Sequence, residues 1–303
     1  MRILITGATG QIGSALLSPL ASLGRVLPVA RRDLDLGLAA SIEPTLDHLN
    51  PDLIINPAAY TAVDRAEDEP ELAHAINAVA PGVIARWAAV RKVPLIHFST
   101  DYVFDGSRNS PWREQDPTQP LSVYGMSKLE GEKRIHSANG PHLILRTSWV
   151  YAARGQNFLR TIARLAAERD ALRIVNDQVG APTSARSIAE AITHLLGVGQ
   201  SDLARYFATA GGLVHLAAAG ETSWHGFASE IVKGLRARGV TLKANAILPI
   251  ATKDHPTKAI RPRNSRLALD HLAHSFGIVM SDWRESLQLE LDELARQTLD
   301  GVS

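Results

Sequence analysis

The sequence predicts an α/β protein, with a Rossmann-like doubly wound parallel sheet followed by a smaller mixed α/β substrate-binding domain in the C-terminal half. Over the first 150 residues, short apolar runs alternate with longer amphipathic stretches, which is typical of a parallel sheet with helices on both faces. The short runs are nearly continuous apolar runs and do not alternate with polar residues, as in strands buried on both sides. A glycine-rich turn follows the first run directly.

The elements of the first half follow from these patterns. Strands are expected at the apolar runs 2–6, 25–30, 51–59, 93–100 and 142–149. Helices are expected at the stretches with helical periodicity, 11–24, 38–50, 67–92 and 122–138. Gly24 is expected to end the first helix, and Pro81 to break the third.

The second half is less regular. Its predicted helices span 157–170, 185–197, 223–239 and 282–297, its predicted strand spans 213–218, and a loop rich in Pro and Arg spans 254–267. We therefore expect a dinucleotide-binding Rossmann domain at 1–150. Residues 151–303 would form mainly the substrate domain, with segments at about 203–235 returning to the sheet.

Composition excludes several classes of function. The 303 residues include 32 basic and 31 acidic side chains, for a net charge of +1, so no long-range field attracts nucleic acid or a membrane. The absence of Cys excludes disulfides and thiolate chemistry, and the eleven His show no ligand spacing, so no metal is expected. No apolar run reaches the roughly 20 residues that span a bilayer. We expect a cytoplasmic monomer or weak homodimer.

The glycine turn "GATGQIG" indicates a dinucleotide site. Gly7, Gly10 and Gly13 lie between the first strand and the first helix. There they let the chain turn tightly, and they bring backbone N–H groups and the helix N-terminus against a pyrophosphate. The spacing is one residue longer than the usual fingerprint.

The end of the second strand indicates which cofactor is bound. An acidic residue there would bind a ribose 2′-hydroxyl, whereas a guanidinium suits a 2′-phosphate. Arg31 and Arg32 stand at this place, and Asp33 and Asp35 follow. The pattern favours NADPH, with NADH possible.

The stretch "VYGMSK" predicts an acid–base pair. Tyr124 and Lys128 are four residues apart on a predicted helix, so they share a face. An ammonium beside a phenol lowers the pKa of that phenol from its usual value of about 10. Thr100 ends a predicted strand, at the carboxyl edge where open α/β sheets bind ligands, and its hydroxyl could hold a carbonyl oxygen there.

Together these motifs resemble the extended short-chain dehydrogenase/reductase family, and within it the reductases of dTDP-linked 4-keto-6-deoxy sugars. The matching stretches cover nearly the whole chain: "GATGQIG", "NPAAYTAVDRAE", "FSTDYVFDG", "VYGMSKLEGE", "LRTSWVY", "NDQVGAPTSA", "HLAAAGETSWHGFA" and "RPRNSRL". The resemblance implies NADPH-dependent reduction of dTDP-4-dehydro-L-rhamnose to dTDP-L-rhamnose, in nucleotide-sugar biosynthesis. It implies that Tyr124 gives the proton, that Lys128 lowers the Tyr124 pKa and binds the nicotinamide ribose, and that Thr100 orients the carbonyl.

The resemblance also implies the binding residues. The cofactor would contact Gly7, Gly10, Gln11, Ile12, Gly13, Arg31, Asp35, Leu36, Ala58, Ala59, Tyr60, Thr61, Tyr124 and Lys128. The dTDP-sugar substrate would contact Thr100, Asp101, Tyr102, Trp149, Arg261 and Arg266.

Two other hypotheses stay open at the level of sequence. One is a sugar-nucleotide epimerase that retains and recycles its NAD. The other is a regulatory subunit that binds a dinucleotide without catalysis, although the intact Thr100, Tyr124 and Lys128 argue against it.

Overall fold

The computed structural model describes residues 1–199 and 201–300 and is built on a six-stranded sheet. The strands lie in the order β10-β5-β4-β3-β1-β2, and every neighbouring pair is parallel. Their bounds are β1 Arg2–Thr6, β2 Arg25–Val29, β3 Leu53–Asn56, β4 Leu95–Thr100, β5 His142–Thr147 and β10 Leu213–His215. The predicted Rossmann-like α/β fold is confirmed.

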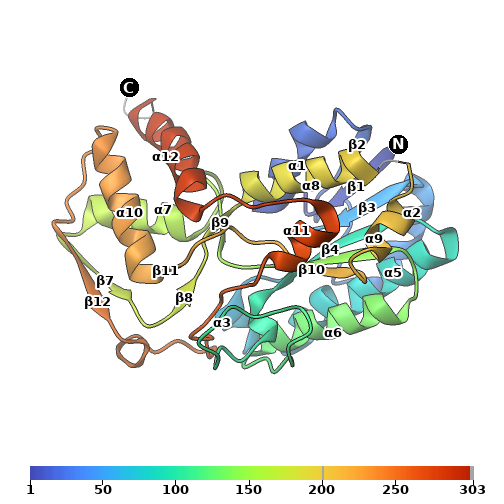
Figure 1. Cartoon of the computed structure of the whole chain (residues 1–303), viewed down its shortest axis with the longest axis horizontal. Coiled ribbons are helices and arrows are strands. Elements are labelled where there is room, and N and C mark those ends of the chain that lie inside the picture. The colour runs from blue at the N-terminus through green and yellow to red at the C-terminus, as the bar shows by residue number, and fades with distance from the viewer. Residues whose placement is uncertain (200, 301–303) are drawn as a thin grey trace.

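Helices cover both faces of this sheet (Figure 1). One face carries α1 (Gln11–Leu20) and α8 (Ala185–Gly199), and the other carries α2 (Ile42–Leu49), α5 (Ala80–Arg91) and α6 (Val123–Ser137). Successive strand residues point to opposite faces. Ile3 and Ile5 of β1 therefore belong to the core under α1 and α8, while Leu4 belongs to the core under α2, α5 and α6.

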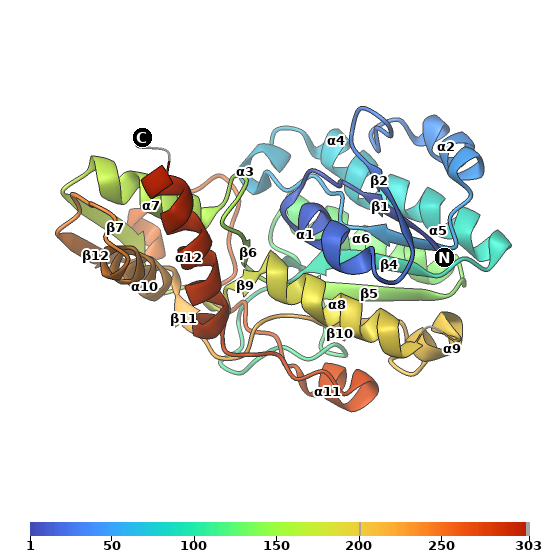
Figure 2. The ribbon, with the colours of Figure 1, turned by 90° about the horizontal axis from the view of Figure 1, so that it is seen from above.

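The rest of the second half packs around its own core. Helices α7 (Phe158–Glu168), α10 (Trp224–Ala237) and α12 (Trp283–Asp300) gather around Phe227 and Trp283, at one end of the molecule (Figures 1 and 2). Three two-stranded sheets accompany them: β6 (Val150–Tyr151) with β9 (Thr183–Ser184), β7 (Ala171–Val175) with β12 (Ala246–Ile250), and β8 (Val179–Gly180) with β11 (Thr222–Ser223). The division of the chain at residue 150 stays a prediction.

Several predicted elements are shorter in the structure, for local reasons. The first helix ends at Leu20, after Pro19. Gly24 does not end the helix. It lets the chain pass close to the Met1 carbonyl, with which a Cβ at this position would collide, and that carbonyl accepts from the Arg25 N–H at the start of β2. Strand β3 stops at Asn56, before Pro57.

The long helical stretch at 67–92 is interrupted before Pro81. It consists of α4 (Pro70–His74), a π-helical turn at Ala75–Val79 and then α5. Single π turns inside helices often occur at functional sites.

Short elements escaped prediction. They comprise α3 (Val63–Ala66), α9 (Leu203–Ala208), α11 (Asp270–Phe276), the 3₁₀ turns Asp101–Val103 and Thr252–Asp254, and β6, β7, β8, β9, β11 and β12. The helix predicted at 38–50 begins as a 3₁₀ turn at Ala39–Ser41. Across residues 1–199 and 201–300, no helix is both long and apolar enough to cross a membrane.

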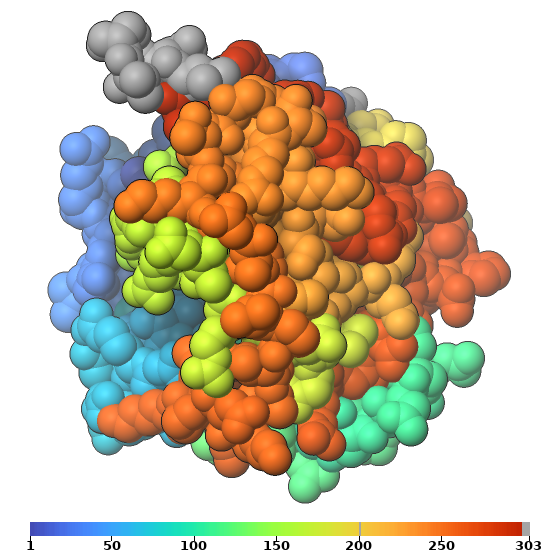
Figure 3. All heavy atoms as spheres, turned by 90° about the vertical axis from the view of Figure 1, so that its left-hand side faces the viewer, coloured from blue at the N-terminus to red at the C-terminus, as the bar shows by residue number. Residues whose placement is uncertain are grey.

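The loop after β12 joins the two halves on one side. The Ala259 N–H and the Arg261 guanidinium donate to Asp64 on α3, at 3.1 and 2.7 Å, and Lys258 pairs with Asp68. Figure 3 shows this loop, in orange, against the cyan atoms of the first half.

Candidate active site

A cavity of about 1080 Å³ opens at the carboxyl edge of the sheet and extends toward the second half. Its walls come from the ends of β1, β3, β4 and β5, from α6 and from loops of the second half. This is where a doubly wound sheet binds ligands. All the residues predicted to bind cofactor or substrate line the cavity except Arg266.

The glycine turn has the shape of a phosphate cradle. Gly7 has a φ of +54°, which side-chain-bearing residues rarely adopt, and a Cβ at Gly13 would collide with the Gly7 carbonyl. The first turn of α1 holds no acidic residue, and Gly10 leaves its N-terminal N–H groups without a side-chain cap. A pyrophosphate fits these groups, since it accepts hydrogen bonds from them and is favoured by the helix dipole.

Arg31, Asp35 and Leu36 line the cavity beyond this turn. The Arg31 side chain is 74% exposed, and its Nε lies 3.6 Å from the Asp35 carboxylate. Asp35 Oδ1 accepts from the Gly37 N–H at 2.9 Å. Since Asp35 is held by the backbone and Arg31 is largely exposed, the guanidinium can turn toward a phosphate.

The wall formed by 58–61 is fixed by the π-helical turn. Asn77, on that turn, accepts from the Tyr60 N–H at 2.8 Å and donates to the Tyr60 carbonyl at 3.0 Å and to Ser127 Oγ at 3.0 Å. One buried amide thus joins the loop to α6. Sequence reasoning missed Asn77, and the only signal was an Asn within an apolar helical stretch.

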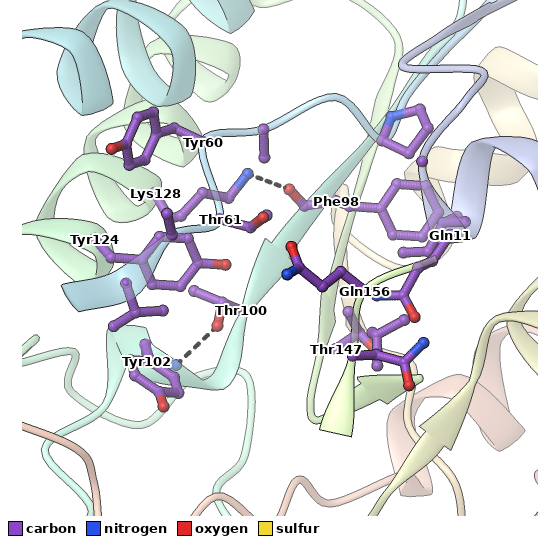
Figure 4. Close-up of a pocket in the computed structure, with 18 of the residues that line it drawn as sticks. Gln11, Tyr60, Thr61, Phe98, Thr100, Tyr102, Tyr124, Lys128, Thr147 and Gln156 are labelled. Atoms are coloured by element: carbon purple, nitrogen blue, oxygen red, sulfur yellow. Dashed lines mark hydrogen bonds between the residues drawn. The ribbon is translucent and has the colours of Figure 1, made fainter. Parts of the chain in front are cut away.

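The side chains of Thr100, Tyr124 and Lys128 meet in the cavity (Figure 4). Helix α6 begins at Val123, with Ser122 Oγ accepting from the Gly125 N–H at 3.2 Å, so Tyr124 and Lys128 lie on successive turns. A Cβ at Gly125 would collide with the Tyr102 carbonyl. Glycine in "VYGMSK" therefore lets α6 approach the end of β4, where Thr100 lies.

The pKa values differ from the sequence expectation. Burial raises the pKa of Tyr124 to about 12, against a lowering effect from its hydrogen bond with Thr100. Burial also lowers the pKa of Lys128 to about 8, while the Glu132 carboxylate opposes that change. The lowered Tyr124 pKa predicted from the Tyr–Lys spacing is not found, because desolvation dominates and the Lys128 ammonium lies against the Phe98 carbonyl and His97. Tyr124 is thus protonated at neutral pH.

Asp101 is a buried carboxyl beside these groups. It is 2% exposed, and Oδ1 accepts from Thr100 Oγ1 at 3.1 Å. Burial raises the pKa of Asp101 to about 7, against lowering effects from hydrogen bonds with Ser265 and Thr100.

This raised pKa predicts how stability depends on pH. An unfolded Asp, with a pKa of 3.8, is ionised at pH 6, whereas folded Asp101 keeps its proton up to about pH 7. Folding takes up a proton, so stability falls as the pH rises through 7. We expect the free energy of unfolding to drop by about 1 kcal/mol between pH 6 and pH 8 because of this group. Urea denaturation should show a smaller drop in Asp101→Asn, and an equal drop would contradict the assignment.

Two Trp rings form part of the wall toward the second half. Trp149 and Trp224 are stacked, with ring centroids 3.5 Å apart and planes 11° apart. Trp149 has a φ of +48°, a strained conformation that tends to occur at functional sites. Trp149 thus faces the cavity from the end of β5, as a binding residue would.

The two predicted arginines lie in different places. Arg261 lines the cavity, and its Nε is buried without a hydrogen-bond partner among the described residues. Arg266 does not reach the cavity: its guanidinium donates to Glu221, Asn264 and the Asn109 carbonyl at 2.7–2.8 Å. These bonds use its donors to join loops, so we do not propose a substrate contact for it.

Sequence reasoning missed most of the wall formed by the second half. These residues are Gly155, Gln156, Asn157, Phe158, Thr161, Arg173, Ile174, Val175, Gln178, Trp224, His255 and Thr257. Gln178 and Trp224 fall inside stretches that carried the family resemblance, which was an available signal. Ser223 caps the start of α10, since its Oγ accepts from the Gly226 N–H at 3.0 Å. Within residues 1–199 and 201–300, no three His, Asp or Glu side chains are grouped so that they could hold a metal ion.

Comparisons with known proteins agree along nearly the whole chain. A family model described as "RmlD substrate binding domain" matches residues 1–296. A dTDP-4-dehydrorhamnose reductase of Burkholderia thailandensis is 46% identical, over 98% of this chain and 100% of that protein. A solved dTDP-4-dehydrorhamnose reductase of Clostridium acetobutylicum has a TM-score of 0.87 and 35% identity, over 97% and 99% of the two chains. One of Bacillus anthracis, in complex with NADP, has a TM-score of 0.87 and 32% identity, over 96% and 99%.

Proposed function

The chain belongs to the RmlD substrate binding domain family, and from this premise we propose that it is an NADPH-dependent reductase of dTDP-4-dehydro-L-rhamnose. The product would be dTDP-L-rhamnose. The observation that carries the proposal is the meeting of Thr100, Tyr124 and Lys128 in one cavity with the glycine turn. Full-length similarity to reductases of this name supports it.

The residues have separate roles in this reaction. When bound, the nicotinamide supplies the hydride that reduces the carbonyl carbon. Thr100 holds the carbonyl oxygen, and the Tyr124 hydroxyl gives its proton to that oxygen as negative charge develops there. Lys128 stabilises the resulting phenolate, since an ammonium in a desolvated site interacts strongly with negative charge. Trp149 and Arg261 bind the sugar nucleotide. The Arg261 guanidinium pairs with the diphosphate of that nucleotide.

Cofactor preference is proposed to depend on Arg31. Removal of a hydrogen bond between charged groups costs about 2 kcal/mol, so Arg31→Ala should raise the Kd for NADPH about tenfold or more. The Kd for NADH should stay the same. Arg32→Ala is the matched control, because the Arg32 side chain is 88% exposed and does not line the cavity. Its Nε lies 3.5 Å from Asp33 Oδ1. Fluorescence titration would test this, and equal effects of the two variants would assign the phosphate site elsewhere.

The proposed function is tested by NADPH oxidation at 340 nm. Purified protein is given NADPH and enzymatically prepared dTDP-4-dehydro-L-rhamnose, and the sugar product is analysed. Oxidation of one NADPH for each sugar reduced supports the reductase. The same assay with UDP-linked 4-keto sugars measures the preference for the nucleotide.

Other outcomes would replace the proposal. Tight NADPH binding without oxidation, by protein that keeps its fold, would overturn the reductase and favour a regulatory subunit. Retained NAD(H) with isomerised sugar and no net oxidation would favour an epimerase.

A further inference from the structure

A chain of buried polar side chains begins behind Lys128 and crosses three strands. Lys128 Nζ lies 3.2 Å from Nε2 of His97 on β4, and His97 Nδ1 lies 3.1 Å from Nδ2 of Asn56 on β3. Asn56 Oδ1 lies 2.5 Å from Oγ1 of Thr6, at the end of β1. Asn56 and His97 are register partners, and all four residues are at most 2% exposed. Strand register therefore places polar groups in a row beneath α6.

This row decides which proton Lys128 can exchange. An ammonium has three N–H donors, and one is taken by the Phe98 carbonyl at 2.6 Å (Figure 4). If His97 Nε2 accepts a second, the third faces the cavity, which Lys128 lines. A neutral amine keeps two N–H bonds, so both anchoring bonds survive when the third proton leaves. At its far end the row reaches Thr6, which lines the cavity beside the glycine turn, so the row ties Lys128 to three strands of the sheet.

We propose that His97 is a positioning residue for Lys128, held as the Nδ1–H tautomer so that its Nε2 accepts a hydrogen bond from the ammonium. The inference rests on the proposed role of Lys128. The Nδ1–H needs an acceptor, and Asn56 provides one when its amide oxygen faces the ring. This requires the Asn56 amide to be turned over, so that its oxygen faces His97 and its nitrogen faces Thr6. The exchange leaves all other atoms in place, and Asn56 then donates to Thr6. Burial holds the pKa of His97 well below its usual value, so the ring stays a neutral acceptor.

In the competing arrangement, every hydrogen bond along the row runs in the opposite donor-to-acceptor direction. Thr6 would donate to Asn56, Asn56 to His97 Nδ1, and the Nε2–H to a neutral Lys128. The 2.5 Å separation of Thr6 and Asn56 suits an O–H donor. The pKa of about 8 favours the first arrangement, because it leaves Lys128 charged at neutral pH. The short bond to the Phe98 carbonyl also favours it, since such bonds are typical of charged donors. The two arrangements have opposite ring tautomers.

Nitrogen NMR of the ring decides between them. Long-range proton–nitrogen spectra of full-length ¹⁵N-labelled protein at pH 7 give the tautomer of each His, and the signal lost in His97→Gln identifies His97. We expect Nδ1 protonated and Nε2 unprotonated. A protonated Nε2 would overturn the proposal. This measurement needs no turnover, so it stands whether or not the reductase assay succeeds.

A pair of variants tests the consequence for catalysis. The Gln oxygen of His97→Gln can occupy the place of Nε2 and accept from Lys128, whereas His97→Asn reaches only the place of Nδ1 and contacts Asn56. Loss of a hydrogen bond to a charged group predicts that kcat of the Asn variant falls about tenfold or more. The Gln variant should keep more than about a third of the wild-type kcat and the wild-type Kd for NADPH. Equal kcat in the two variants, at equal thermal stability, would contradict the positioning role.

Discussion

Tyr124→Phe is expected to lower kcat about 10³-fold while leaving the Kd for NADPH within about twofold. The substitution removes only the hydroxyl, which is the group proposed to protonate the carbonyl oxygen. The ring keeps its edge-on packing against Tyr102, at a centroid separation of 5.6 Å. The loss should therefore appear in the chemical step, and single-turnover oxidation of NADPH at 340 nm measures it directly.

A matched Tyr→Phe substitution outside the cavity serves as the control. Tyr206 lies on α9 and packs against Phe276 at 4.9 Å, away from the cavity lining, so Tyr206→Phe should retain the wild-type kcat. If Tyr124→Phe kept more than a tenth of the rate, another group would have to be the acid, and buried Asp101 would be the next candidate.

The sheet was predictable because its signal is local. Each of the strands β1 to β5 lies in a mostly apolar run, and the connecting helices have clear periodicity. The small strands β6, β8, β9 and β11 have two residues each, which is too short for any periodicity. The π-helical turn at Ala75–Val79 could not be predicted, because Asn77 is placed by its bonds to Tyr60 and Ser127, which are distant in sequence.

The cavity wall formed by the first half of the chain was predictable, and the wall formed by the second half was not. Parallel strands end at one edge, so Gly7, Ala58 and Thr100 could be brought together from strand order alone. Gln156 and His255 reach the cavity through loops whose course depends on packing between the halves. Arg266 was predicted to line the cavity and does not, because its guanidinium donates to Asn264 and Glu221 instead.

The prediction of a lowered Tyr124 pKa was wrong. Its spacing from Lys128 indicates a nearby charge, which lowers the pKa of a phenol. Desolvation acts in the opposite direction and depends on how much of the chain covers the group. In the structure burial dominates, and the other groups that shift the Tyr124 pKa are Thr100 and Asp101. The proposed stabilisation of the phenolate by Lys128 would therefore develop during the reaction.

Breaking the ion pair behind α6 is expected to have the largest effect on stability. Arg146 of β5 donates to both carboxylate oxygens of Glu132, at 2.9 and 2.7 Å, and both side chains are less than 10% exposed. Arg146→Met would leave the Glu132 carboxylate buried without its partner, at a cost of about 3–5 kcal/mol. That is a large share of the total stability of a typical domain, about 5–15 kcal/mol. Urea denaturation at pH 7 measures the difference.

The double variant Glu132→Met/Arg146→Met separates the cost of an unpaired charge from the value of the pair. Well-packed apolar side chains often replace a buried ion pair without loss, so the double variant should recover at least about half of the stability lost in Arg146→Met. A cost below about 1 kcal/mol for Arg146→Met would mean that Glu132 is solvated or protonated. Glu132 also raises the pKa of Lys128, so its removal should lower that pKa further and move the alkaline limit of kcat to lower pH. The double variant would then regain stability while keeping the altered pH profile. That result would show that a pair which stabilises the fold also sets the charge of Lys128, the lysine proposed to act in catalysis.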